Sequence, residues 1–271
     1  MTDTATTDWA APVPLDGVLI ELADGVLNIT IDRPDSLNSV NPGVLARMAE
    51  ALEFSVGDAR VRVVALRASG RAFCSGADIG ARGSGDDHVP IETLLQANRV
   101  VQAIVSHPRP VVAVVPGATA GVGVALALAC DLVVASDKAF FLLAFTKIGL
   151  MPDGGSTALV AACVGRARAL KMALLADRMP ASEALQCGLI GAVFPADELE
   201  TEAAAIITRL RNGPAVALAR TKRAVNAATL DQLDGALARE AAGQHILLEA
   251  DDVREGKRAF QEKRAPVFTD L

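Results

Sequence analysis

Residues 111–131 read VVAVVPGATAGVGVALALACD and predict a strand, a glycine-rich turn and an apolar helix in succession. The β-branched run 111–115 is typical of a strand buried on both faces, and 122–130 has the composition of a buried helix. The glycines of the turn are Gly117, Gly121 and Gly123. A helix that begins after such a turn presents unpaired N–H groups, which favour negative charge. That charge belongs either to a bound phosphate or to an oxygen that becomes negative during a reaction.

The composition of the chain limits the classes of protein to consider. With 51% hydrophobic but only 3% aromatic residues, the 271-residue chain has the material for an aliphatic core. Its net charge of -6 and isoelectric point of about 5.2 argue against nucleic acid as a partner. No apolar run has the length of a membrane span, and four widely spaced cysteines indicate reduced thiols. Residues 1–15 lack Lys and Arg and fit no targeting signal, so we expect a flexible leader on a cytoplasmic protein.

The remaining elements follow from hydrophobic period and turn signals. Hairpin strands are predicted at 18–22 and 26–31 around Asp24-Gly25, and Asn41 followed by Pro42 is typical of a helix start. That helix is expected to end near Ser55. Further strands are expected at 61–67, 132–135, 139–143 and 192–194, and further helices at 91–105, 156–164, 166–176 and 181–187. After residue 196 only helices are expected, at 197–211, 214–227, 229–249 and 251–262, which indicates an α/β core followed by a helical part.

Four segments together resemble the crotonase superfamily, the enoyl-CoA hydratases and isomerases. Residues 73–79, FCSGADI, resemble its F-x-x-G-A-D-[LI] loop, and 116–131 resemble its second glycine loop with the buried helix. The other two segments are Ile148-Gly149-Leu150-x-Pro152 and Phe260-x-x-Lys263-Arg264-x-Pro266-x-Phe268. The similarity runs in order from about Asp16 to Phe268, which is nearly the whole chain.

The resemblance implies an α/β fold, a crotonase-like spiral of ββα units over 16–196, and a C-terminal helical region, 197–271, that packs subunits into a homotrimer or hexamer. It also implies an acyl-CoA thioester substrate, with coenzyme A entering as part of that substrate and with no separate cofactor. No metal is expected, because none of the three histidines has a suitably spaced partner. The shared chemistry is stabilisation of a thioester enolate, and the matching oxyanion donors are the backbone N–H groups of Ala77 and Val122. Many family members have glycine at the second position, so the valine is expected to reshape the site or narrow the acyl pocket.

Carboxylates distinguish the reactions of this family. Its hydratases use two glutamates, and the matching positions here are Ala125 and Phe145, so two-glutamate hydration is not expected. Asp153, in the sequence Pro-Asp-Gly-Gly, matches the single catalytic carboxylate of family isomerases. One base suits double-bond migration because it takes a proton from one carbon and returns it to another. An Asp before Gly-Gly is also an ordinary turn or N-cap residue.

Other positions match family residues that contact coenzyme A. The implied CoA contacts are Arg33, Ala77, Asp78, Ile79, Phe260 and Lys263. The 77–79 loop would hold the adenine end through backbone groups, with the Asp78 side chain as an acceptor that fixes the loop. A lysine near the CoA phosphates agrees with their charge, although Lys263 is equally a solvated helix lysine. Arg33 also fits a second interpretation, in which it is an exposed arginine at the end of a strand without a role in binding.

Three alternatives to an enoyl-CoA isomerase remain. A non-catalytic acyl-CoA-binding protein of the same fold would also lack both glutamates and have an apolar site. An enoyl-CoA hydratase with an atypical water-positioning group is the second. The third is a dinucleotide-binding protein, but the glycine spacing of 117–123 is not G-x-G-x-x-G. Finally, the glycine-rich stretch 80–90 is expected to form a mobile loop that borders the acyl pocket.

Overall fold

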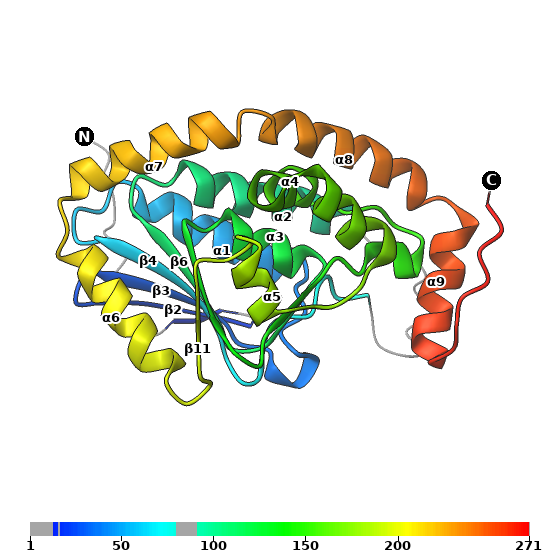
Figure 1. Ribbon diagram of the computed structural model, residues 1–271, viewed down its shortest axis with the longest axis horizontal. Helices are drawn as coiled ribbons and strands as arrows, with labels where there is room; N and C mark the ends of the chain where they lie inside the picture. Colours follow the sequence, from blue (N-terminus) through cyan, green and yellow to red (C-terminus); the bar gives the residue numbers. More distant parts are fainter. Residues whose placement is uncertain (1–12, 16, 80–90, 271) are drawn as a thin grey trace.

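A seven-stranded sheet forms the centre of the molecule (Figure 1). The computed structural model describes residues 13–15, 17–79 and 91–270. In spatial order the strands are β1 (Val13–Leu15), β2 (Val18–Ala23), β3 (Val26–Ile31), β4 (Val63–Ala68), β6 (Val111–Val115), β8 (Leu132–Ser136) and β11 (Ala192–Phe194). The pairings of β1 with β2 and of β2 with β3 are antiparallel, and every pairing from β3 to β11 is parallel.

A smaller sheet of four strands lies beside the first one. Its order is β10 (Met179–Pro180), β9 (Phe140–Leu142), β7 (Ala118–Ala120) and β5 (Ala72–Cys74). Successive pairs β4–β5, β6–β7 and β8–β9 each place one strand in the large sheet and the next in the small sheet. A helix follows each pair: α2 (Ile91–Ser106), α3 (Val122–Ala129) and α4 (Ser156–Leu175). This repetition is the ββα spiral that the sequence resemblance implies.

Two helical layers cover the large sheet because its buried strands are apolar on both faces. In β4, Val64 and Leu66 pack in the main core with α1 (Pro42–Ser55), α2 and α3. The alternate residues Val63 and Ala65 pack against α6 (Leu199–Arg211) on the opposite face. The two faces follow the two-residue period of a strand, and they fix the sheet between layers of helices.

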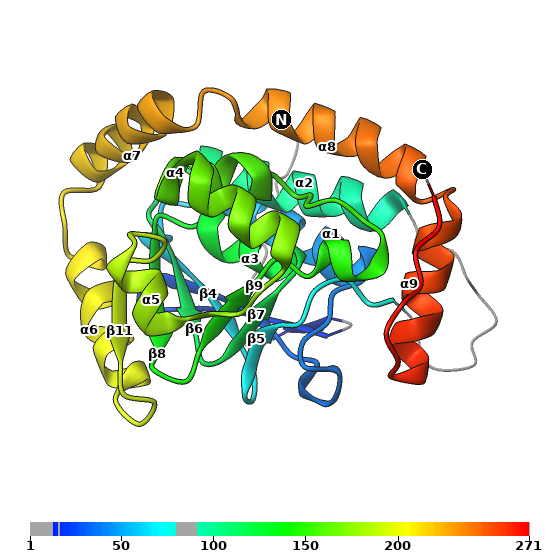
Figure 2. The ribbon, with the colours of Figure 1, turned by 45° about the vertical axis from the view of Figure 1, so that its right-hand side comes forward.

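The C-terminal helices extend over the helical layer as an arch (Figures 1 and 2). They are α7 (Ala215–Thr229), α8 (Leu233–Leu247) and α9 (Asp251–Glu262), and α5 (Ala181–Gln186) precedes them near the end of the small sheet. In both views α7 and α8 pass above α2 and α4, and α9 descends at the far end. Within the described ranges, no helix is long and apolar enough to cross a membrane.

The hairpin around Asp24-Gly25 and the Asn41 cap are confirmed, since the Asn41 side chain accepts a hydrogen bond from the N–H of Val44 at 2.9 Å. The two helices expected at 156–164 and 166–176 are confirmed as well, because non-helical backbone at Gly165 (φ 74°, ψ 167°) divides α4 between them. Val13–Leu15, expected to belong to a flexible leader, instead pairs with β2. The expected mobile loop 80–90 lies outside the described residues.

Candidate active site

A cavity of about 540 Å³ opens where the two glycine loops, the 3₁₀ helix η2 (Phe145–Ile148) and the C-terminal helices meet. Its lining is largely apolar, with Leu94 and Ala97 from α2, Leu142 from β9 and Leu248 after α8. The charged residues that line it are Asp35, Asp78, Lys147 and Asp153. Of the residues expected to act in catalysis, Ala77, Val122 and Asp153 all line this one cavity. Such an apolar cavity with few polar groups is typical of a small-molecule site.

Two glycines bring the donor loops into backbone contact. The point where a β-carbon on Gly121 would stand is 3.4 Å from Cα of Gly76. Both glycines have positive φ, 110° at Gly76 and 54° at Gly121, and each directly precedes an expected donor. In the part of the chain that the structure describes, no group accepts a hydrogen bond from the backbone N–H of Ala77 or Val122. Ala77 and Val122 therefore line one cavity, and each has a backbone N–H without an acceptor among the described residues.

The valine at position 122 fits this turn without backbone strain. The positive φ falls on Gly121, and Val122 is the first residue of α3. Helix α3 also lies close to the first loop, because a β-carbon on Gly123 would stand 2.7 Å from the carbonyl oxygen of Cys74. The positive φ expected to be a difficulty for valine falls on the preceding glycine, and because Val122 lines the cavity, narrowing of the acyl pocket by its side chain stays a prediction.

Asp153 lies beside Val122 on a turn that contains two glycines with positive φ, Gly154 and Gly155. A β-carbon on Gly154 would stand 3.3 Å from Cγ2 of Val122 and 3.2 Å from Cβ of Ala125. Asp153 is half-buried, and burial among apolar groups raises the pKa of its carboxyl to about 7. A hydrogen bond from Gln244 opposes that rise in pKa, and the nearby charge of Glu240 adds to it.

Helix α8 holds this turn on both sides of Asp153. Gln244 donates from Nε2 to Oδ2 of Asp153 at 2.7 Å and to the carbonyl oxygen of Met151 at 3.0 Å. Glu240 accepts from the N–H of Gly155 at 2.6 Å and from the N–H of Thr157 at 2.9 Å. Both side chains are buried, and burial raises the pKa of Glu240 while these hydrogen bonds lower it. The carboxylate position is therefore set by a helix far along the chain.

Sequence reasoning missed Glu240 and Gln244, although their spacing carried a signal. The positions that share one face of α8 are Leu233, Leu237, Glu240 and Gln244, spaced four, three and four residues apart. All four are buried. When the apolar face of a helix continues with a Glu and a Gln, these polar side chains are expected to be buried as well. Buried polar groups need hydrogen-bonding partners, so the pattern predicts such partners inside the fold. Lys147, which also lines the cavity, was missed as well.

The expected coenzyme A contacts do not all meet at the cavity. Asp78, Ile79 and Phe260 line it, and Phe260 does so from the same chain. Asp78 accepts a hydrogen bond from the guanidinium of Arg33 at 2.9 Å, and Arg33 also donates to the carbonyl oxygen of Ser39. Arg33 thus holds the loop instead of lining the cavity. Lys263 follows α9 with positive φ, and it is not part of the lining.

The two positions that match the hydratase glutamates are occupied by apolar side chains that fill space. Ala125 is completely buried within α3, and Phe145 is 8% exposed and lines the cavity. The ring of Phe145 comes within 4.0 Å of the point where a β-carbon on Gly121 would stand. Neither side chain can hold a water or carry a proton.

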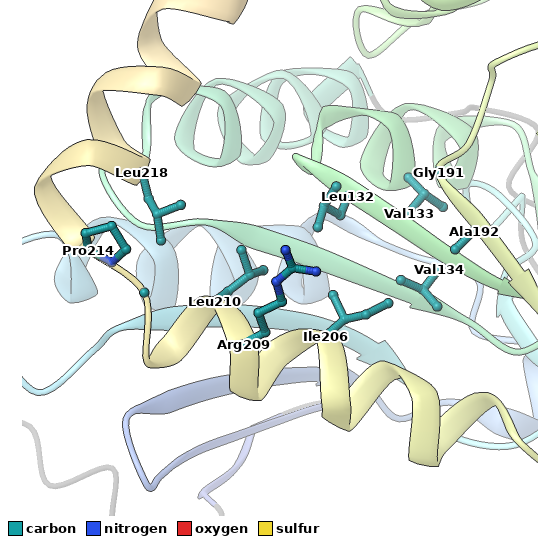
Figure 3. Close-up of a pocket in the computed structure, with 11 residues that line it drawn as sticks. Leu132, Val133, Val134, Gly191, Ala192, Ile206, Arg209, Leu210, Pro214 and Leu218 are labelled. Atoms are coloured by element: carbon teal, nitrogen blue, oxygen red, sulfur yellow. The ribbon is translucent and has the colours of Figure 1, made fainter.

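A second hollow, of about 550 Å³, lies between α6, the start of α7 and strands β8 and β11 (Figure 3). Its lining is mostly aliphatic, including Leu132, Ile206 and Leu218. Arg209 extends from α6 into the space between that helix and β8 (Figure 3). This lining contains no carboxylate, so the first cavity is the one equipped for proton transfer.

The chain belongs to the enoyl-CoA hydratase/isomerase family, because the sequence profile of that family matches residues 21–271. It is 43% identical over 251 residues to a probable enoyl-CoA hydratase of Rhodobacter capsulatus, covering 92% of this chain and 96% of that protein. It is 36% identical over 260 residues to the 1,2-epoxyphenylacetyl-CoA isomerase of Escherichia coli, covering 94% and 99%. A crystal structure of an enoyl-CoA hydratase from Mycobacterium avium subsp. paratuberculosis superposes with a TM-score of 0.90 at 55% identity, covering 95% of this chain and all of that one.

These comparisons confirm the crotonase fold and the family named by the sequence resemblance. The protein is an enzyme of that family, whose members act on acyl-CoA thioesters. The relatives carry both hydratase and isomerase names, and the residues in the cavity are what distinguish the two reactions.

Proposed function

We propose that this enzyme is an enoyl-CoA isomerase that moves a double bond through a thioester enolate. The observation that carries the proposal is the half-buried Asp153, on a turn whose Gly154 packs against Val122. A carboxylate with a pKa of about 7 is a stronger base than an ordinary aspartate, and about half of it is ionised at neutral pH. Replacement of the two hydratase glutamates by Ala125 and Phe145 supports isomerisation over hydration.

The proposed reaction is a proton shift within a 3-enoyl-CoA. Asp153 takes a proton from C2, the electron pair of that C–H bond forms a C1=C2 double bond, and the π pair of the thioester carbonyl moves to its oxygen to give a dienolate. The N–H groups of Ala77 and Val122 donate to this oxygen as its negative charge grows, and each such donor contributes about 3 kcal/mol. The dienolate then takes the proton from Asp153 at C4, so that the 3,4 double bond is lost and a 2,3 double bond forms. The proposed reaction consumes neither water nor a cofactor.

The substrate is proposed to bind with its acyl group among the apolar residues of the cavity and its coenzyme A part toward Asp78 and Ile79. Lys147 supplies a cation at the same cavity, which supports an anionic ligand such as coenzyme A. Arg33 acts indirectly, by holding Asp78.

A homotrimer, or a hexamer of two trimers, is proposed as the assembled state. None of the residues of α7, all of which are described, is buried, and its Val216 is 72% exposed. On α4, Leu174 and Leu175 are 66% and 60% exposed. Exposed apolar side chains of this kind are typical of surfaces that a second subunit covers. Mass measurement by light scattering across a dilution series tests this assignment.

The reaction is tested with a panel of 2-enoyl-, 3-enoyl- and saturated acyl-CoA thioesters. We expect conversion of 3-enoyl-CoA to 2-enoyl-CoA without formation of a 3-hydroxyacyl product, and loss of that conversion in Asp153→Asn with acyl-CoA affinity retained. An Asp153→Ala variant with unchanged turnover contradicts the proposal. Binding of all thioesters without turnover would instead identify an acyl-CoA-binding protein, and a hydroxyacyl product would identify a hydratase.

A further inference from the structure

The amide of Gln244 is fixed by the backbone before it reaches Asp153. Its Oε1 faces the N–H of Met151 at 3.4 Å, while its Nε2 donates to the carbonyl oxygen of the same residue at 3.0 Å. Because a carboxamide has one donor end and one acceptor end, these two contacts fix which end is which. The remaining N–H of Nε2 then lies 2.7 Å from Oδ2 of Asp153.

Close packing keeps α8 against this turn. A β-carbon on Gly243 would stand 2.3 Å from Sδ of Met151, so the backbone of α8 lies directly against this side chain. Glu240, one turn earlier, holds the other side of the turn through Gly155 and Thr157. The side chain of Gln244 is 2% exposed, which shields its hydrogen bonds from water.

We infer that Gln244 is a positioning residue for Asp153, which helix α8 uses to hold the carboxylate toward the cavity and keep it an effective base. The inference rests on the proposed proton transfer by Asp153. A single donor to Oδ2 fixes one carboxylate oxygen and leaves the other one to take up the proton.

A neutral amide suits this position better than a charged side chain. Glu240 already places a like charge near Asp153, and the other charged residues that line the cavity are Asp35, Asp78 and Lys147. A second carboxylate at position 244 would raise the pKa of Asp153 further, and a lysine would lower it and weaken the base. The amide stabilises the ionised form through one hydrogen bond without adding charge.

The test compares Gln244→Leu with Gln102→Leu. Gln102 on α2 also donates to an aspartate of α8, Asp234, at 3.3 Å, but this pair is exposed and is not part of the cavity lining. The control therefore removes the same type of side chain and the same kind of hydrogen bond.

In Gln244→Leu we expect kcat for 3-enoyl-CoA to fall about 10- to 100-fold, with KM changed less than about threefold. The acidic limb of the pH profile should move to higher pH, because the bond that lowers the pKa of Asp153 is lost.

A direct measurement separates this inference from the proposed reaction. The pKa of the Asp153 carboxyl is followed by carbon NMR in the wild type, in Gln244→Leu and in Gln244→Glu, with Asp153→Asn identifying the signal. We expect the pKa to rise in Gln244→Leu and to rise more in Gln244→Glu, with no change in Gln102→Leu. An unchanged pKa in both Gln244 variants overturns the inference, whether or not the wild type isomerises 3-enoyl-CoA. A wild type without turnover, but with the expected pKa changes, contradicts only the proposed reaction. Gln244→Glu keeps the shape of the side chain and serves if the leucine variant does not fold.

Discussion

Cα of Gly76 lies 3.4 Å from the position that a β-carbon on Gly121 would occupy, so the two donor loops touch through their backbones. These glycines are separated by a full ββα unit in the chain. Each has a backbone conformation that other residues rarely adopt, with φ of 110° and 54°. The spacing of the N–H groups of Ala77 and Val122 is therefore set by a contact that contains no side chain.

Substitution of Gly121 by alanine should damage both the fold and the site. At φ 54° and ψ -130° the alanine would be strained, at a cost of about 1–3 kcal/mol in the free energy of unfolding. Chemical denaturation and kcat/KM measure the two effects together. Gly57→Ala is the control, because nothing lies within 4 Å of its β-carbon position. Equal stability of both variants would show that the positive φ at Gly121 carries no strain.

The elements that the sequence predicted well have strong local signals. Asp24-Gly25 indicates a hairpin and Asn41-Pro42 a helix start, because these residues act on their own backbone. The three-residue strands β5 and β7 were missed, since each is stabilised by the pairing of distant segments and not by its own composition. Asp153 was found through the family pattern. Its partner Gln244 was missed, because the spacing of the buried positions on α8 indicates a buried partner for this residue but does not identify that partner as Asp153, 91 residues away.

The rate of isomerisation should depend on the ionised form of Asp153. Since its pKa is about 7 and the base must be deprotonated, kcat/KM is expected to rise with pH through that value and then level off. The profile is measured between about pH 5 and pH 9 with a 3-enoyl-CoA. A limb near the ordinary pKa of aspartate, about 4, would show that the active base is not held in the apolar environment described here.

The free energy of unfolding should also depend on pH through Asp153. It should fall as pH rises, whereas the rate of isomerisation should increase. Because the folded-state pKa of Asp153 is raised, the folded chain binds more protons than the unfolded chain between about pH 4 and pH 7. The contribution of Asp153 to the free energy of unfolding is thus present at low pH and lost as pH rises through about 7.

The variant Asp153→Asn removes this titration. It should be more stable than the wild type at pH 8 and closer to it at pH 4, although it is inactive. Urea denaturation of both proteins at the two pH values checks the difference. Parallel stability curves across pH would contradict the assignment.

An ion pair joins α7 to the core and should contribute strongly to stability. Nζ of Lys222 is 2.9 Å from Oδ2 of Asp131, and the two side chains are 7% and 18% exposed. Lys222→Met would leave Asp131 largely buried without its cation, at a cost of about 3 kcal/mol. The matched control is Lys138→Met, because its pair with Asp137 is mostly exposed and should contribute less than about 1 kcal/mol. Thermal denaturation of both variants measures the contrast.

The hydrogen bonds that join α8 to Met151, Asp153, Gly155 and Thr157 have a consequence for protein design. If the Pro-Asp-Gly-Gly turn were transferred into a related protein by itself, the carboxylate would be present but its orientation would not be fixed. A working design would also have to include Glu240 and Gln244 of α8. The carboxylate therefore functions through two segments that are distant in sequence, the turn and the facing side of α8, and not through the turn alone.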